Sequence, residues 1–230
     1  MRARCLRHGR ACMISTRQLA YRYPSGPELR FEDIDLPQGG VLLLRGASGS
    51  GKSTWLALAA GLLTASNGDI SVAGQSLKVL SKVASDAWRA QTIGFLPQKL
   101  HLSAALTVHD NLAMAQWAAG QRPDEARIAE ALGALAVQAL AGRKPSQLSG
   151  GQAQRVALAR AVLLQPQVIL ADEPSASLDD EAAEASLALL YATAQRQGAT
   201  LVIATHDARV YASLKDKKDL QSMQIGRKQL

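Results

Sequence analysis

Short apolar runs recur along the chain and predict the strands of a parallel sheet. Residues 41–44, 168–171 and 201–204 contain no polar side chain, and a weaker run covers residues 92–96. Runs of this length are too short for most helices, and strands that are buried on both faces of a parallel sheet have this composition. The pattern therefore predicts an α/β protein with a parallel core sheet.

Helical patterns lie between these runs. Residues 52–63 are rich in Ala and Leu. Residues 123–125 read Pro-Asp-Glu, which is typical of a first helical turn with proline at its first position and acids beside it. Ile128, Leu132 and Leu135 follow at spacings of four and three and form one apolar face. These patterns predict helices between the strands.

Two other regions complete the predicted architecture. A turn at residues 66–69 leads into a candidate strand at 70–73, and with residues 14–40 this indicates a small antiparallel layer beside the parallel core. Residues 99–148 have a mostly helical pattern. With the start of the next helix they predict an inserted α-helical lobe over about residues 99–160.

The composition allows one substantial core, since 47% of the 230 residues are hydrophobic. The formal net charge is +7, and four of these charges are arginines within residues 1–13. We expect that segment to be a basic, disordered leader and residues 14–230 to be a single domain. The other basic residues are scattered, with no platform of aromatic and basic side chains for bases. No nucleic-acid partner is therefore expected.

The chain shows no targeting or membrane-spanning pattern. Its apolar stretches are far shorter than the ~20 residues needed to cross a bilayer, and none follows the leader as a secretory signal requires. Cys5 and Cys12 are too few for a disulfide scaffold and match no metal-binding spacing. These observations favour a cytoplasmic protein.

A glycine-rich loop follows the first apolar run. Its residues are Gly46, Ala47, Ser48, Gly49, Ser50, Gly51, Lys52 and Ser53, with Thr54 next. They fit the pattern G-x-x-x-x-G-K-[ST], in which backbone N–H groups and a helix N-terminus bind phosphate oxygens. Lys52 is expected to reach the β- and γ-phosphates, and the Ser53 hydroxyl to bind Mg²⁺. An ordinary glycine turn is the alternative.

Two acids, Asp172 and Glu173, end a buried run side by side. A pair of acids there is costly unless it holds a metal or a water. Asp172 suits coordination of Mg²⁺, directly or through water, and Glu173 suits the general base for an attacking water. The alternative is a pair of helix-capping acids before Pro174.

A capping box of the form Ser-x-x-Gln begins another predicted helix, at Ser149 and Gln152. The residues between them are Gly150 and Gly151, and each glycine in a helix costs about 0.5–1 kcal/mol relative to Ala. A cap alone does not need them, whereas a phosphate that approaches the bare helix N-terminus does. A well-capped helix without a ligand remains the alternative interpretation.

Candidate site groups follow all four apolar runs: the glycine loop, the two acids, His206 and Gln98. Ligands of open α/β sheets bind beyond the carboxyl ends of the strands. We therefore expect these groups to share one edge of the sheet.

The stretch LSGGQAQRVALARAVL, followed by VILADEPSASLD, resembles the signature-to-Walker-B region of ATP-binding cassette (ABC) ATPases, and the resemblance spans roughly residues 14–210. It implies a P-loop NTPase core with the antiparallel layer and helical lobe expected above, and ATP and Mg²⁺ as cofactors. It also implies a head-to-tail homodimer, in which each ATP lies between the glycine loop of one subunit and the signature helix of the other.

The resemblance also implies roles for single residues. Gln98 corresponds to the Q-loop residue, which senses Mg²⁺ or the attacking water and links to the membrane partner. His206 corresponds to the switch histidine, and residues 176–179 to the D-loop that crosses the dimer seam, with Asp179 at its end. Tyr23 corresponds to the aromatic residue that stacks on adenine, with Tyr21 as the alternative.

We expect an ATPase subunit of a membrane transporter that docks on separate permease subunits near Gln98 and the helical lobe, at the cytoplasmic face of the membrane. Residues 86–112 are similar to cassettes of the lipoprotein-release and macrolide-export type, which favours an exporter. The alternative is a non-transport cassette that regulates a membrane or division complex. A P-loop kinase would leave the signature unexplained.

Overall fold

The structure is a computed structural model, and it describes residues 12–176, 178–217 and 219–226. The expected leader lies largely outside this range. Strand β1 (Cys12–Arg22) already includes Cys12 and Met13. Both of these residues were predicted from the sequence to belong to the leader.

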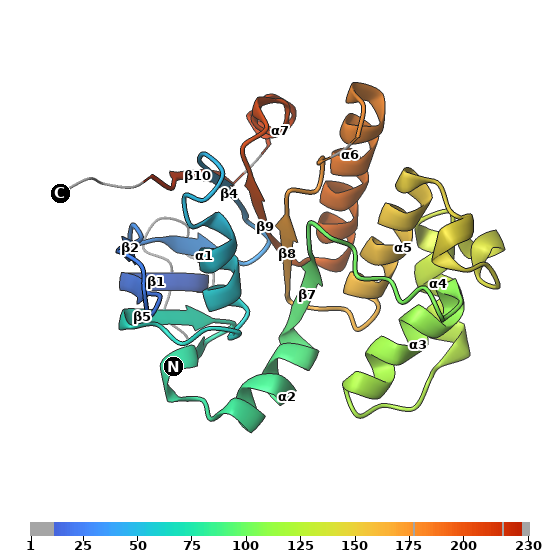
Figure 1. Ribbon diagram of the computed structural model, residues 1–230, viewed down its shortest axis with the longest axis horizontal. Coiled ribbons are helices and arrows are strands. Elements are labelled where there is room, and N and C mark those ends of the chain that lie inside the picture. Colours follow the sequence, from blue (N-terminus) through green and yellow to red (C-terminus); the bar gives the residue numbers. More distant parts are fainter. Residues whose placement is uncertain (1–11, 177, 218, 227–230) are drawn as a thin grey trace.

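A parallel sheet of five strands forms the centre of the molecule (Figure 1). Its order is β10-β4-β9-β8-β7, and every neighbouring pair is parallel. The strands are β4 (Val41–Arg45), β7 (Ile93–Leu96), β8 (Val168–Asp172), β9 (Thr200–Thr205) and β10 (Leu220–Gln224). The four predicted strands are confirmed. The edge strand β10 was not predicted, because its half-exposed sequence LQSMQ has no apolar run.

An antiparallel sheet flanks this core, as the sequence predicted. Its strands are β1, β2 (Glu28–Arg30), β3 (Asp35–Pro37), β5 (Asn67–Val72) and β6 (Gln75–Ser76). Strand β1 pairs with β2, β3 and β5. The expected turn at 66–69 is wrong for most of its length, because Asn67 already pairs with Ala20 of β1. Ladder pairing has here overridden the turn propensity of Asn-Gly.

Helix α1 (Lys52–Ala59) lies between the two sheets (Figure 1). Leu42 and Leu44 of β4 point to this side and pack in one buried cluster with Trp55 of α1 and Ile70 of β5. The helix is shorter than the predicted 52–63, because Ala60 caps it and Gly61 adopts a left-handed φ of 64°. The short helix begins directly at the end of the glycine loop, since Gly51 is its N-cap.

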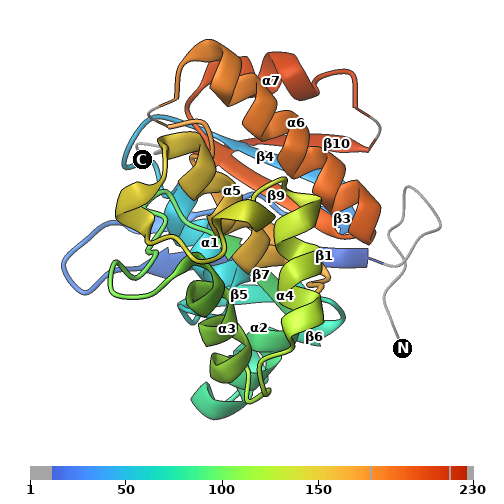
Figure 2. The ribbon, with the colours of Figure 1, turned by 90° about the vertical axis from the view of Figure 1, so that its right-hand side faces the viewer.

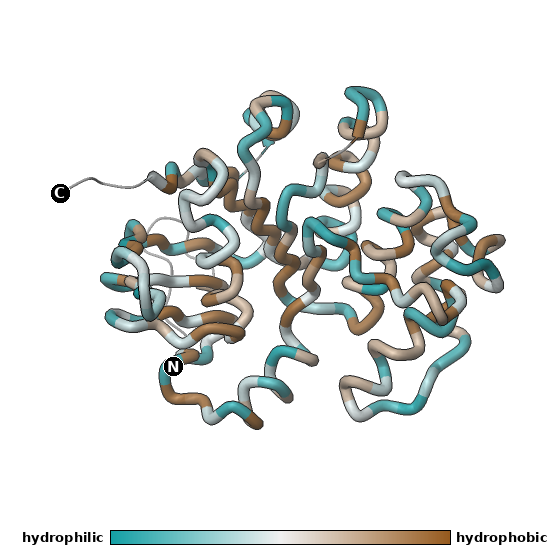
Figure 3. Tube along the Cα trace, in the orientation of Figure 1, coloured by the Kyte–Doolittle hydropathy of each residue, from teal (hydrophilic) through white to brown (hydrophobic). Residues whose placement is uncertain are grey.

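The opposite face of the parallel sheet is covered by α5 (Gly150–Val162) and α6 (Asp180–Gln197), as Figure 2 shows. Val41 and Leu43 alternate with the residues above and belong to this second buried cluster. Both faces of the central strands are thus apolar, which explains their continuous hydrophobic runs (Figure 3).

The helical lobe lies to one side and contains α3 (Val108–Ala118), α4 (Glu125–Ala134) and the short helices η2 (Gln138–Leu140) and η3 (Pro145–Gln147), which lead into α5. Ile128 and Leu132 are buried, as their spacing predicted. Pro123 is not the first helical residue. Asp124 is the N-cap of α4 and accepts a hydrogen bond from the Arg127 N–H, so the helix begins at Glu125.

The remaining elements are η1 (Leu77–Val79), α2 (Lys82–Thr92) and α7 (Ala208–Leu214). Among the residues that the structure describes, none of the helices combines the length and the apolar character of a membrane span.

Candidate functional site

A pocket of about 370 Å³ opens at the carboxyl ends of the parallel strands. The glycine loop after β4, Gln98 after β7, Glu173 after β8 and His206 after β9 all contribute to its wall. Its lining residues are Tyr23, Pro27, Leu29, Ser48, Gly49, Gly51, Lys52, Ser53, Thr54, Gln98, Glu173 and His206. The structure therefore brings the four predicted groups together at one sheet edge.

The glycine loop has a backbone that only glycine can form at two of its positions. Gly46 has φ of 155°, and a Cβ there would lie 2.2 Å from the Ile225 carbonyl oxygen. Gly51 has φ of 108° and is the N-cap of α1, so the loop turns directly into the helix. The helix N-terminus thereby faces the pocket with its first N–H groups, which is the geometry that binds anions.

Lys52 places a positive charge at the base of the pocket. Its side chain is only 5% exposed. The Nζ group donates hydrogen bonds to the carbonyl oxygens of Gly46 at 2.8 Å and Ala47 at 3.1 Å. It also lies 3.5 Å from Oε1 of Glu173. The Lys52 ammonium thus interacts with several oxygen acceptors at once. An anionic ligand in the pocket can replace some of them.

Glu173 is held in one orientation. Its backbone has a φ of 48°, which is uncommon for a residue with a side chain. The Thr205 hydroxyl donates to Oε2 at 2.9 Å, and Nδ1 of His206 lies 2.8 Å from Oε1. Burial alone would raise the pKa of Glu173, but the hydrogen bonds from His206 and Thr205 outweigh it and lower the pKa. The side chain is therefore an ionised acceptor beside the pocket.

Asp172 does not line the pocket, but it lies behind Ser53. Burial raises the pKa of Asp172, while an interaction with the Ser53 hydroxyl and the charge of Lys52 act in the other direction. Its Oδ1 atom is buried and has no hydrogen-bond partner. An orphaned carboxylate oxygen next to a hydroxyl is a suitable donor set for Mg²⁺, which needs few protein ligands.

No group of three or more His, Cys, Asp or Glu side chains able to hold a metal occurs in residues 12–176, 178–217 and 219–226.

Tyr23 follows β1 and forms the outer wall of the pocket. Its hydroxyl lies 3.0 Å from the Thr54 hydroxyl, and its ring packs edge-on against Tyr21 at 4.8 Å between centroids. Tyr21 is half-buried and does not line the pocket. Of the two candidates, Tyr23 has the ring that a planar ligand can reach.

The signature residues lie away from the pocket, at the start of α5. The predicted capping box is present: the Gln152 N–H donates to Oγ of Ser149 at 3.3 Å, and the Ser149 N–H donates to Oε1 of Gln152 at 3.0 Å. A Cβ at Gly150 or Gly151 would meet no atom within 4 Å. Nothing within the described part of the chain therefore requires glycine at these two positions.

The predicted D-loop also lies outside the pocket. Asp179 is the N-cap of α6 and accepts from the Ala182 N–H at 2.8 Å. Ser177, within the same segment, lies outside the described residues.

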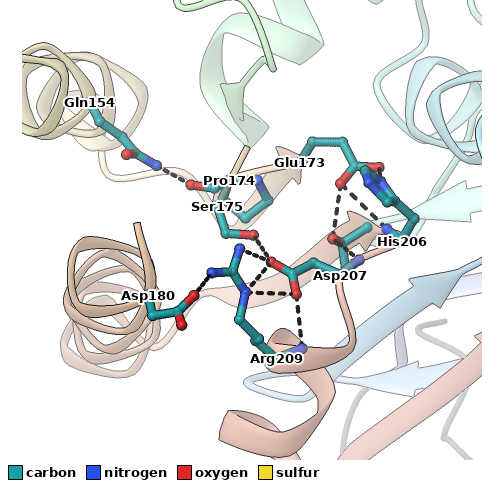
Figure 4. Close-up of polar contacts among 9 residues, drawn as sticks. Gln154, Glu173, Pro174, Ser175, Asp180, His206, Asp207 and Arg209 are labelled. Carbon is teal, nitrogen blue, oxygen red and sulfur yellow. Dashed lines mark hydrogen bonds and ion pairs between the residues drawn. The ribbon is translucent and has the colours of Figure 1, made fainter. Parts of the chain in front are cut away.

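Several residues in or beside the pocket were not predicted from the sequence. Pro27 and Leu29 line the pocket, and no motif marked them. Thr205 orients Glu173, and its place at the end of the β9 run was the available signal. A cluster of Ser175, Asp207 and Arg209 beside His206 was also missed (Figure 4).

The chain is similar to known proteins over most of its length. A family model described as ABC transporter matches residues 31–176. The lipoprotein-releasing system ATP-binding protein LolD of Idiomarina loihiensis is 36% identical over 88% of this chain and 91% of its own length.

Two solved structures have the same fold. One, a dimeric ATP-binding cassette in a post-hydrolysis state with ADP and Pi, is 28% identical, covers 94% of this chain and 97% of its own, and has a TM-score of 0.79. The other, cbiO1 from Clostridium perfringens, described as part of the transporter complex cbiONQ, is 26% identical over 94% of this chain and 86% of its own, with a TM-score of 0.81.

Proposed function

This chain belongs to the ABC transporter family as an ATP-binding and ATP-hydrolysing subunit, and we propose that the pocket at the strand ends binds MgATP and hydrolyses it. The single observation that carries this proposal is the convergence of Lys52, Gln98, Glu173 and His206, which follow four different strands, on one pocket. No simpler structural role accounts for polar groups of these types at four adjacent strand ends.

The residues divide the work between binding and reaction. The N–H groups of the glycine loop and of the start of α1, with Lys52, hold the phosphates. Ser53 and Asp172 hold Mg²⁺ together with Gln98, and when bound the cation neutralises charge that develops on the phosphates. Tyr23 stacks on the adenine.

Glu173 accepts a proton from the attacking water in this proposal. Its lowered pKa keeps it ionised, and His206 and Thr205 fix its oxygens. Gln98 and His206 line the pocket together with Glu173, so a water held there has an acceptor and two orienting partners.

A second copy completes the site in this proposal. Ser149, Gly150, Gly151, Gln152 and Asp179 lie outside the pocket of their own chain, while the bare glycine N-terminus of α5 is open. A head-to-tail pair places that helix end against the phosphates of the other copy. The dimeric form of the similar cassette with ADP and Pi supports this arrangement.

We further propose that membrane subunits dock near Gln98 and the helical lobe, at the cytoplasmic face of the membrane. Met114 and Trp117 lie one turn apart on α3, and both are exposed, Trp117 to 57%. Contiguous exposed apolar surface marks protein interaction sites, and these two neighbouring side chains are the part of α3 that we propose for such a contact. The similar protein of Idiomarina loihiensis is named as the ATP-binding protein of a lipoprotein-releasing system, which supports a role for this chain in such a multi-subunit system.

The Glu173→Gln substitution tests the hydrolytic site. It removes the proton acceptor but keeps the shape of the side chain, so the turnover of ATP should fall by about 10²- to 10⁴-fold. ATP binding, followed with a fluorescent analogue, should persist. The matched control is Glu184→Gln, at an exposed position of α6. Unchanged turnover in the Glu173 variant would remove this residue from its proposed role.

A second experiment tests the docking surface. Trp117→Asp should reduce recovery of the chain with its membrane subunits in detergent, while the isolated chain keeps its ATPase activity. Ala192→Asp adds the same charge to the exposed face of α6 and should leave recovery unchanged. Equal recovery of both variants would show that the membrane subunits dock elsewhere.

A further inference from the structure

A cluster of charged side chains beside the pocket joins two segments that are far apart in the sequence (Figure 4). Arg209, in α7, donates from Nε and Nη2 to the Asp207 carboxylate at 2.7–3.0 Å. Its remaining Nη1 group contacts the Asp180 carboxylate at the start of α6. Ser175 donates to Oδ2 of Asp207 at 3.0 Å. None of these four residues lines the nucleotide pocket.

The same cluster continues to the candidate general base. The Asp207 N–H donates to Oγ1 of Thr205 at 3.0 Å, and the Thr205 hydroxyl donates to Oε2 of Glu173 at 2.9 Å. His206 lies between Thr205 and Asp207 in the sequence, and its Nδ1 contacts Oε1 of the Glu173 carboxylate. The loop that carries His206 is thus held from one side by Glu173 and from the other by Arg209.

Asp180 connects this loop to the start of α6. It is the first residue of α6, directly after the N-cap Asp179, whose carboxylate accepts from the Ala182 N–H at 2.8 Å. The Arg209 side chain links this helix start to the Asp207 carboxylate. The contacts therefore run from the start of α6 through Arg209, Asp207 and Thr205 to Glu173.

Stability alone does not explain the Arg209 bridge. The Arg209 side chain is 45% exposed and that of Asp180 is 90% exposed. Ion pairs at such positions contribute little to the free energy of unfolding. The cap of α7 does not need it either, because Asp207 caps that helix by accepting from the Arg209 backbone N–H at 2.9 Å. The guanidinium instead spans two carboxylates with its planar set of donors, a geometry that lysine cannot reproduce.

We propose that Arg209 is a positioning residue that couples the start of α6, with its N-cap Asp179, to the loop that carries His206. The inference rests on the proposed function, since it assumes that Glu173 and His206 act in hydrolysis. When a second copy contacts the start of α6 at Asp179, the bridge transmits the position of this helix end to the two side chains at the pocket. Arg209 does this without touching the nucleotide.

The test is a double-mutant cycle on the steady-state ATPase activity of the full chain. Arg209→Gln should lower kcat by about 2- to 30-fold, the range for a coupling residue without ligand contact. KM for ATP should change little, because the pocket wall is intact. Asp180→Asn should have an effect of similar size, and the double variant should be no worse than the poorer single variant.

Arg196→Gln is the matched control, because Arg196 is an exposed arginine at the other end of α6. It should retain the kcat of the unchanged protein. Thermal unfolding of all variants separates positioning from folding, and the Arg209 and Arg196 variants should unfold at similar temperatures.

Three results would overturn the proposal: an unchanged kcat in Arg209→Gln, effects of the two substitutions that simply multiply, or a lower kcat that a lower unfolding temperature accounts for. The Glu173→Gln experiment tests the proposed function independently of the coupling. If that variant keeps its turnover, the proposed base is wrong, whereas a normal Arg209→Gln protein beside an inactive Glu173→Gln protein rejects only the coupling.

Discussion

Lys52 is the residue on which nucleotide affinity should depend most. It is almost fully buried, yet its ammonium is shared between two backbone carbonyls and the Glu173 carboxylate. A buried lysine is costly unless its charge has a partner, and phosphate oxygens supply a stronger one than carbonyl groups do.

We expect Lys52→Ala to weaken ATP binding by about 10- to 100-fold, since hydrogen bonds to charged groups contribute about 1.5–3 kcal/mol. Equilibrium titration with a fluorescent ATP analogue measures this. Lys215→Ala, at an exposed position just after α7, should bind normally. An unchanged affinity in the Lys52 variant would contradict the phosphate-binding role of the loop.

Asp172 should lower the free energy of unfolding of the nucleotide-free protein and contribute to Mg²⁺ binding. Burial raises its pKa above the ordinary value of 3.8. A group with a raised folded pKa contributes stability that is fully present below its unfolded pKa and is lost as the pH rises through the folded value. At pH 7 the raised pKa of this carboxyl, whose buried Oδ1 atom has no hydrogen-bond partner, therefore lowers the stability of the nucleotide-free protein.

Asp172→Asn should accordingly unfold at a higher urea concentration than the unchanged protein at pH 7, and the difference should shrink towards pH 4 and below. The same variant should need more Mg²⁺ for ATP hydrolysis. Urea titrations at the two pH values, with Mg²⁺ titrations of activity, measure both effects. A variant that is less stable at pH 7 and has a normal Mg²⁺ requirement would show that Asp172 serves only the fold.

At the scale of elements, His109 joins the first turns of α3 and α4. Its Nε2 lies 2.7 Å from Oε2 of Glu125, and its Nδ1 lies 3.2 Å from Oδ1 of Asp110. Partial burial lowers the pKa of His109, but the hydrogen bonds that its ring donates to the carboxylates of Asp110 and Glu125 outweigh it, so that the pKa lies above its ordinary value of 6.5. The protonated ring ties the two helices of the lobe together.

Because this pKa is raised, the contribution of His109 to stability is fully present below pH 6.5 and is lost as the pH rises through the folded value. The free energy of unfolding of the unchanged protein should exceed that of His109→Asn by more at pH 5.5 than at pH 8.5. We expect the change to stay below about 1 kcal/mol, since the pair is partly exposed. Urea unfolding at the two pH values measures it, and a difference that grows with pH would contradict the assignment.

The elements show where sequence patterns suffice and where they do not. Strands β4, β8 and β9 were predicted because both of their faces are buried, so that each contains a continuous run of four apolar residues. Strand β10 lies at the edge of the sheet and carries polar residues, which leaves no pattern to detect. At residues 66–69 the predicted turn is replaced by pairing of β5 with β1. At Pro123 the predicted first helical position lies outside α4, because Asp124 is the N-cap of that helix.

The candidate site divides in the same way. Lys52, Glu173 and His206 stand in motifs at strand ends, so their convergence follows from the topology. The contact of Arg209 with Asp180 depends on how α7 and α6 pack against each other, and a single sequence carries no record of that packing. The family resemblance favours Tyr23 over Tyr21 for contact with the adenine, and the position of Tyr23 in the pocket wall supports this prediction.

At the scale of the whole molecule, the two halves of the proposed reaction site lie apart in one chain. The phosphate-binding loop faces its own pocket, whereas the glycine-rich start of α5 belongs to the helical side of the molecule and lines no part of that pocket (Figure 1). In the proposed function, one copy binds the nucleotide and a second copy completes its enclosure. Hydrolysis should therefore require two copies.

The most direct measurement is the mass of the Glu173→Gln protein by sedimentation, with and without saturating MgATP, because this variant keeps the nucleotide in place. We predict a monomer without nucleotide and a dimer with it, and a monomer under both conditions when Lys52→Ala is added. A Glu173→Gln protein that binds MgATP and yet stays monomeric, alone and with its membrane subunits, would contradict the head-to-tail site.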